Sequence, residues 1–228
     1  MSQITFTRPD GATCTGHYFE PAQGAASAPG LVVIQEWWGL NEQIKGVAEQ
    51  YAARGYRVLV PDLYRGKVGL DAREAEHLMH GLDFGEAASQ DIRGAVQYLK
   101  QQSAKVGVTG YCMGGALTLL AACFVPEVDA GCAWYGFPPL EYIDASKIRV
   151  PLMGHWATRD AFFPIAQVDA LEEMLKAAGV SYEFYRYDAV HAFANETHGN
   201  KPGPFSHDAT AAEMAMTRTL AFFEANLR

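Results

Sequence analysis

A cysteine set between glycines is the clearest sign of chemistry in this sequence of 228 residues. The run Gly110-Tyr111-Cys112-Met113-Gly114 has the spacing of the turn that presents a nucleophile between a buried strand and a helix, with cysteine where serine is more usual. The flanking glycines let neighbouring backbone segments approach closely around such a strained turn. Free N–H groups at the start of the helix favour a thiolate and form part of an oxyanion hole. Cys112 is therefore the predicted nucleophile. The alternative is a small apolar side chain packed beneath a helix, as we expect for Cys123 and Cys132.

A cysteine nucleophile needs a base. An aspartate and a histidine that lie later in the sequence could supply it together. Asp160 follows an apolar stretch, and His191 follows a later one, so the chain order is nucleophile, acid, histidine. His191 would accept the thiol proton, and Asp160 would hold the imidazole in the useful tautomer. Each has a simpler alternative, because Asp160 could cap the helix that starts near Pro164 and His191 could be a polar loop residue.

These three residues must be positioned by alternating strands and helices. Short apolar runs predict strands at 31–34, 57–60, 105–109, 130–134, 151–155 and 182–187. Helical periodicity predicts helices at 44–52, 89–102, 113–123, 165–178 and 208–226, the first capped by Asn41 and ended by Gly55. Right-handed crossovers then give an α/β fold with a mostly parallel central sheet and helices on both faces. Residues 3–19, which contain Asp10-Gly11, predict an antiparallel hairpin at the sheet edge. We expect a single domain over 1–228.

The candidate residues share one edge of this sheet. In parallel sheets, loops and helix N-termini converge where strands end, so chemistry is expected there. The positions that follow predicted strands hold Gln35-Glu36-Trp37-Trp38, Pro61-Asp62, Gly110 to Gly115, Asp160 and His191.

Taken together, these segments resemble the dienelactone hydrolase family along nearly the whole chain. The matching segments are Ile34-Gln35-Glu36-Trp37-Trp38-Gly39, Pro61-Asp62-Leu63-Tyr64, Gly110-Tyr111-Cys112-Met113-Gly114-Gly115, Asp160 and His191-Ala192-Phe193. The resemblance implies an α/β-hydrolase fold with a Cys112–His191–Asp160 triad. It also implies hydrolysis of a small enol-lactone, the carboxymethylene-butenolide formed during chlorinated aromatic degradation, to maleylacetate.

The same resemblance assigns roles around the nucleophile. Glu36 would accept a hydrogen bond from the resting thiol and shift as substrate binds, which helps to generate the thiolate. A carboxylate placed directly after a buried strand needs partners, although an exposed acidic loop residue is the alternative. The backbone N–H groups of Trp37 and Met113 would hold the oxyanion.

Substrate recognition is where the sequence departs from the family pattern. Family members that act on dienelactone place two arginines around the substrate carboxylate, and Arg73 fits the first. The alternative is that Arg73 is a surface charge on a helix. His77 stands one helical turn later, where those enzymes have a tyrosine. Asn195 occupies the second arginine's position, four residues beyond His191, so recognition of an anionic lactone should be weaker unless Lys201 or Arg186 compensates. The aromatic side chains that could line the pocket are Trp37, Trp38, Trp134 and Tyr135, although aromatic residues in such a chain are more often part of the core.

The composition and net charge of the chain disfavour several classes of partner. The 26 acidic and 18 basic residues give a net charge of -8, which disfavours a nucleic-acid partner. No apolar run reaches the roughly 18–20 residues that cross a bilayer, so we expect a cytoplasmic protein without a membrane partner. Four cysteines without a C-x-x-C pair, and a single His77–His80 pair, make a poor metal site. We therefore expect no cofactor or metal, and a monomer or small homo-oligomer.

Three functions remain open at this point. The first is hydrolysis of a small lactone or activated ester through a thioester on Cys112. The second is a broad carboxylesterase or thioesterase whose substrate carries no carboxylate. The third is a non-catalytic redox sensor that uses Cys112, which is disfavoured because a sensor needs neither Asp160 nor His191.

Overall fold

The computed structural model describes residues 1–21 and 25–228 and is built on one eight-stranded sheet. The strands lie in the order β1-β2-β4-β3-β5-β6-β7-β8. The pairs β1–β2 and β2–β4 are antiparallel, and every later pair is parallel. The strands are β1 (Ser2–Thr7), β2 (Thr13–Phe19), β3 (Gly30–Ile34), β4 (Arg57–Pro61), β5 (Val106–Tyr111), β6 (Ala130–Trp134), β7 (Leu152–Ala157) and β8 (Tyr182–Tyr187).

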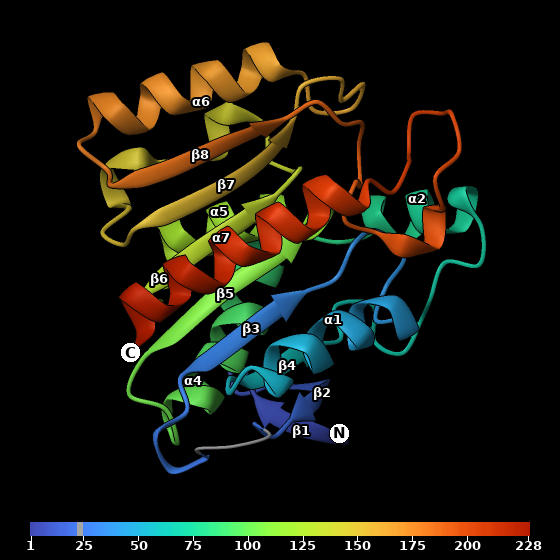
Figure 1. Ribbon diagram of the computed structural model, residues 1–228. Coiled ribbons are helices and arrows are strands. Elements are labelled where there is room, and N and C mark those ends of the chain that lie inside the picture. Colours follow the sequence, from blue (N-terminus) through green and yellow to red (C-terminus); the bar gives the residue numbers. More distant parts are fainter. Residues whose placement is uncertain (22–24) are drawn as a thin grey trace.

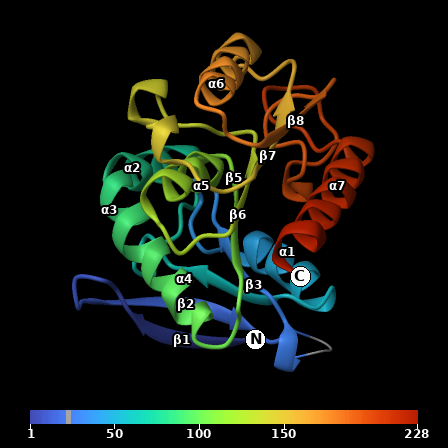
Figure 2. The ribbon, with the colours of Figure 1, turned by 90° about the vertical axis from the view of Figure 1, so that its left-hand side faces the viewer.

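Helices cover both faces of this sheet. The α-helices are α1 (Glu42–Ala53), α2 (Ala72–His80), α3 (Phe84–Glu86), α4 (Arg93–Lys100), α5 (Met113–Phe124), α6 (Ile165–Ala177) and α7 (Ala209–Leu227). The 3-10 helices are η1 (Ala25–Ser27), η3 (Leu140–Tyr142), η4 (Ala145–Lys147) and η5 (Glu196–His198), and η2 (Ala87–Ile92) is a π-helical segment. In Figure 2, α1 and α7 lie on one side of the sheet and α4 and α5 on the other.

The burial of each strand explains this layering. All residues of β3, β4, β5, β6 and β7 are buried, as expected for strands with helices on both sides. Along β3, Leu31 and Val33 pack toward α1 and α7, whereas Val32 and Ile34 pack toward α4 and α5. The predicted mostly parallel sheet, the helices on both faces and the N-terminal antiparallel edge hairpin are confirmed.

Capping residues in the sequence predicted several helix ends correctly. One helix differs from the prediction. Asn41 caps α1 by accepting a hydrogen bond from the N–H of Ile44 at 3.1 Å. The helix predicted over 89–102 instead begins as α3 and passes through the π-helical turn η2 before it continues as α4. That turn contains Asp91, a buried carboxylate bound by Arg8 at 3.1 Å and Arg65 at 2.8 Å. These partners are distant in sequence, so local periodicity carried no sign of the turn.

The carboxyl ends of the parallel strands point to one side of the molecule. Figure 1 shows the arrowheads of β3 and β5 directed toward α2 and the orange-red loop that follows β8. Within the described residues, no helix has the length and apolarity needed to span a membrane. In the same part of the chain, no group of three His, Cys, Asp or Glu side chains could hold a metal ion.

Candidate active site

Cys112 occupies the bend between β5 and α5. Its backbone has φ 54° and ψ −117°, a conformation that non-glycine residues rarely adopt. A Cβ atom on Gly114 would lie 2.5 Å from the carbonyl oxygen of Ile34, and one on Gly110 would collide with the backbone of Gly114. The turn therefore requires glycine at both positions. The side chain of Cys112 is partly exposed, as a nucleophile must be.

His191 and Asp160 form a chain of hydrogen bonds with the sulfur of Cys112. His191 Nε2 is 3.1 Å from Cys112 Sγ, and His191 Nδ1 is 2.7 Å from Asp160 Oδ2. The second oxygen of Asp160 accepts hydrogen bonds from the N–H groups of Phe162 at 2.8 Å and Phe163 at 2.9 Å. The three side chains come from the loops after β5, β7 and β8. The alternative that Asp160 caps the helix after it is wrong, because α6 begins at Ile165 after Pro164 and has no side-chain cap. Asp160 instead uses one carboxylate oxygen for the turn at Phe162 and Phe163 and the other for His191.

Aromatic rings enclose the imidazole of His191. Phe163 stacks on it at 5.4 Å between ring centroids, and Tyr135 meets it edge-on at 5.3 Å. Burial alone would lower the pKa of His191. The negative charge of Cys112 and the hydrogen bond to Asp160 outweigh burial and raise this pKa to about 10. The protonated form of His191 is accordingly favoured.

Glu36 is a buried carboxylate on the same side of the sheet. Tyr135 donates its hydroxyl to Glu36 Oε1 at 3.2 Å, and Asn195 donates its amide N–H to Oε2 at 2.6 Å. Burial raises the pKa of Glu36, which the charge of His191 and these two hydrogen bonds oppose. The sulfur of Cys112 has His191 as its hydrogen-bond partner. The family resemblance had instead predicted that the resting thiol donates a hydrogen bond to Glu36.

The residues expected to hold an oxyanion flank the nucleophile. Met113 is the first residue of α5, and first-turn N–H groups have no acceptor within their own helix. Trp37 lies directly after Glu36 and is partly exposed. In the described ranges 1–21 and 25–228, the N–H groups of Trp37 and Met113 donate to no protein oxygen.

Comparison with known proteins decides the family. Residues 15–227 match the model of the dienelactone hydrolase family. The chain belongs to the dienelactone hydrolase family. It is similar to "Protein usf" of Aquifex pyrophilus, at 32% identity over 98% of this chain and 98% of that protein. It is also similar to a "Putative carboxymethylenebutenolidase" of Aquifex aeolicus, at 30% identity over 86% of this chain and 88% of that protein.

The fold agrees with this family. A dienelactone hydrolase-like promiscuous phosphotriesterase from metagenomic libraries superposes with a TM-score of 0.86 at 22% identity, over 100% of this chain and 99% of that one. The α/β-hydrolase fold is confirmed, and the protein is a hydrolase that acts on esters, as a dienelactone hydrolase family member.

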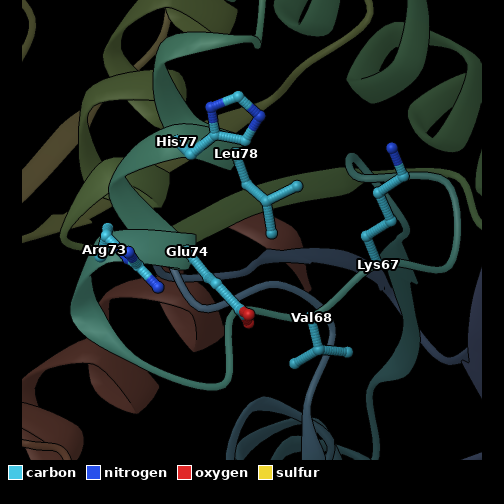
Figure 3. A pocket seen from close by; sticks show the side chains of 6 residues that line it. All are labelled: Lys67, Val68, Arg73, Glu74, His77 and Leu78. Atoms are coloured by element: carbon cyan, nitrogen blue, oxygen red, sulfur yellow. The ribbon is translucent and has the colours of Figure 1, made fainter.

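Two of the residues predicted to bind substrate line a groove on α2. Arg73 and His77 border a cavity of about 580 Å³ together with Lys67 and Leu78, as Figure 3 shows. The groove lies next to the segment that contains Trp38. Gly69 follows Val68 of the groove, and its N–H donates to the carbonyl of Trp38 at 2.9 Å. Neither Lys67 nor Arg73 forms an ion pair within the described residues. The groove therefore offers positive charge near Trp38. The residues that line it are Lys67, Val68, Arg73, Glu74, His77 and Leu78.

Asn195 lies apart from that groove and faces Glu36. It is 1% exposed, and its Oδ1 accepts hydrogen bonds from the backbone N–H of Thr197 at 3.0 Å and from the Thr197 hydroxyl at 2.6 Å. With its amide nitrogen on Glu36, every polar atom of this side chain except one N–H has a partner. In this dienelactone hydrolase family member, the position supplies a hydrogen bond to a carboxylate of the protein.

The compensating cations considered from the sequence lie elsewhere. Arg186 is held against α6 by Asp169 at 2.6 Å and Glu172 at 2.5 Å, so the expectation that it could compensate at the substrate site is wrong. Lys201 borders a separate surface cavity of about 500 Å³ with Arg159, on the loop that follows His191.

Several aromatic side chains around His191 escaped sequence reasoning. Phe162 and Phe163 lie two and three positions after Asp160, and that proximity in sequence was the only available signal for them. Phe205 and His198 belong to the loop after β8, and nothing in their local sequence indicated that they would reach the site.

Proposed function

We propose that the protein hydrolyses a small enol-lactone or related activated ester through a thioester on Cys112, with Asp160 and His191 completing a triad. The observation that carries this proposal is the continuous hydrogen-bonded line from Cys112 Sγ through both nitrogens of His191 to Asp160. Such a line activates the sulfur and returns a proton to the leaving group.

The steps follow from the positions of these groups. The thiolate of Cys112 attacks the carbonyl carbon, and the resulting oxyanion is held by the N–H groups of Trp37 and Met113. The imidazolium of His191 gives its Nε2 proton to the leaving oxygen as the carbon–oxygen bond breaks, which leaves a thioester. Water then attacks the thioester while Nε2 takes its proton, and the carbon–sulfur bond breaks to release the acid and regenerate the ion pair.

The leading substrate is a dienelactone-type enol-lactone that opens to maleylacetate. The groove that contains Lys67 and Arg73 supports it, because a substrate carboxylate pairs well with a guanidinium. The second candidate is a neutral ester, as for a broad carboxylesterase. The amide of Asn195, which is uncharged and bonded to Glu36, favours this alternative.

Replacing Arg73 by alanine separates these two substrate classes. We expect kcat/KM for dienelactone isomers to fall about 10-fold, as loss of a charged hydrogen bond predicts, while kcat/KM for neutral lactones and aryl esters stays within about twofold. A panel of both substrate classes, assayed on wild type and variant, makes the measurement. Arg149→Ala is the matched control, since that guanidinium donates to the carbonyls of Ser146 and Ile148. Equal losses on both classes would exclude charge recognition by Arg73.

The rate should also depend on pH in a way that reflects His191. Because its pKa is raised to about 10, the imidazolium persists at neutral pH and is lost only as the pH rises through about 10. We expect kcat/KM for an alkyl ester to fall above that pH, since the leaving alkoxide then has no proton donor. An aryl ester with a good leaving group should not show this fall. An alkyl-ester profile that falls near the ordinary imidazole pKa of about 6.5 would contradict the stabilised imidazolium.

A further inference from the structure

A run of aromatic rings lies beside the proposed nucleophile, and we call Phe162, Phe205, His198 and Trp38 the aromatic run. Phe162 and Phe205 stack with ring centroids 4.9 Å apart and an interplanar angle of 19°. Phe205 stacks in turn on His198 at 5.3 Å and 24°, and His198 lies 6.4 Å from Trp38. Residues far apart in sequence thus form one surface of successive ring contacts.

One end of the aromatic run reaches the reacting groups. The ring of Phe162 lies 5.2 Å from that of His191, and the ring of Phe205 lies 5.8 Å from it. The Nε2 atom of the same imidazole is 3.1 Å from Cys112 Sγ. A group attached to a carbonyl carbon at Cys112 Sγ would therefore lie beside His191, whose ring Phe162 contacts.

The aromatic run remains open to solvent, unlike the aromatic core beneath it. Phe162 is 50% exposed, and Phe205, His198 and Trp38 are each partly exposed. Trp134, in the adjoining core, is fully buried. Keeping large apolar rings in water is unfavourable, so an exposed cluster of them at the mouth of a site indicates a surface that a ligand covers.

The aromatic run is also uncharged. Burial and the nearby positive charge of His191 lower the pKa of His198, so its imidazole is neutral at neutral pH and stacks as an aromatic ring. The other three members are Phe and Trp side chains. A planar neutral ring fits this surface better than a flexible alkyl chain, because offset stacking between aromatic rings stabilises the contact beyond what burial alone provides.

We propose that the aromatic run is the subsite for a planar, unsaturated ring of the ester substrate, an aryl group or a conjugated lactone ring, with Phe162 and Phe205 as its specificity-determining residues. This inference rests on the proposed function and names the part of the substrate that the aromatic run recognises. The charged groove on α2 then remains available for a carboxylate on the same substrate.

The test compares two activated esters in Phe162→Leu and Phe205→Leu, which keep an apolar side chain but remove the ring. We expect kcat/KM for naphthyl acetate to fall about 3- to 10-fold in each variant, which is the stacking contribution of one aromatic pair. For trifluoroethyl acetate, the same ratio of variant to wild type should stay within about twofold. Phe162→Trp should restore the naphthyl rate. Phe124→Leu is the control, because that ring is 39% exposed at the end of α5 and is not part of the aromatic run.

Binding of the product separates failure of the subsite from failure of the catalytic proposal. Naphthol should bind Cys112→Ala several-fold more tightly than Cys112→Ala/Phe162→Leu, measured by calorimetry, whether or not the wild type turns over either ester. Equal affinities, or equal loss of rate on both esters, would overturn the subsite and leave Phe162 as packing for His191. Absence of turnover with unequal affinities would instead overturn the hydrolytic mechanism alone.

Discussion

Cys112→Ala should abolish hydrolysis of every ester and lactone that the wild type accepts, with kcat falling by about 10⁴-fold or more. The residue supplies the only atom that forms the proposed covalent intermediate, and removal of a nucleophile leaves just the contribution of binding and the oxyanion site. Mass spectrometry of the wild type during turnover should show a stoichiometric acyl adduct on Cys112. Cys112→Ser should also lose about 10²-fold or more, because a hydroxyl is far harder to deprotonate than a thiol.

Cys123→Ala is the matched control for this experiment. Cys123 lies near the end of α5, the helix that follows Cys112, but burial raises its pKa to about 11, so it remains a protonated thiol at neutral pH. We expect unchanged kcat in this variant. Full activity in Cys112→Ala would overturn the thioester mechanism. Rapid modification of Cys112 by peroxide, in a protein that turns over no ester, would point to redox sensing instead.

The bend that presents Cys112, the proposed nucleophile, could be predicted from sequence because its constraints are local. The bend at Cys112 needs glycine at 110 and 114, since a Cβ at either position meets backbone atoms. A strand before the bend and a helix after it are both readable from apolar periodicity. Asp160 and His191 could be found for a related reason: each follows a strand of a parallel sheet, and all such positions share one edge.

The partners of Glu36 could not be found in this way. Asn195 is separated from Glu36 by 159 positions, and its contact depends on how the loop after β8 folds back over the sheet edge. The sequence position suggested a substrate-binding residue, whereas the structure places the amide on a buried carboxylate. Loop conformation is set by tertiary packing rather than by a repeating pattern, so composition and spacing carry little of it.

The same limit applies to the aromatic run. Phe205 reaches His191 through a single isolated bridge between the two backbone segments, outside the eight strands of the sheet. Its neighbours Phe162 and His198 come from different loops. Periodicity assigns buried faces of helices and strands, but it cannot assign which loop side chains meet above a sheet.

Asp160→Asn should lower kcat by about 10³- to 10⁴-fold with little change in stability, by the reasoning that applies to other triads. The N–H groups of Phe162 and Phe163 require an oxygen at the Oδ1 position, so the amide nitrogen of asparagine must face His191. That nitrogen donates to Nδ1 and drives the imidazole proton to Nε2, where it points at Cys112 and blocks proton acceptance. Steady-state kinetics and thermal unfolding of the same preparation make the measurement.

Asp188→Asn is the control, because Asp188 pairs with Arg159 at 2.7 Å on the surface and is 86% exposed. Exposed ion pairs contribute little, so we expect both the rate and the melting temperature to be unchanged in this variant. A large fall in melting temperature for Asp160→Asn, with a rate per folded molecule close to wild type, would mean that Asp160 only stabilises the turn at Phe162 and Phe163. The retained acceptor at Oδ1 predicts the reverse, because the turn uses one carboxylate oxygen and the proposed catalysis uses the other.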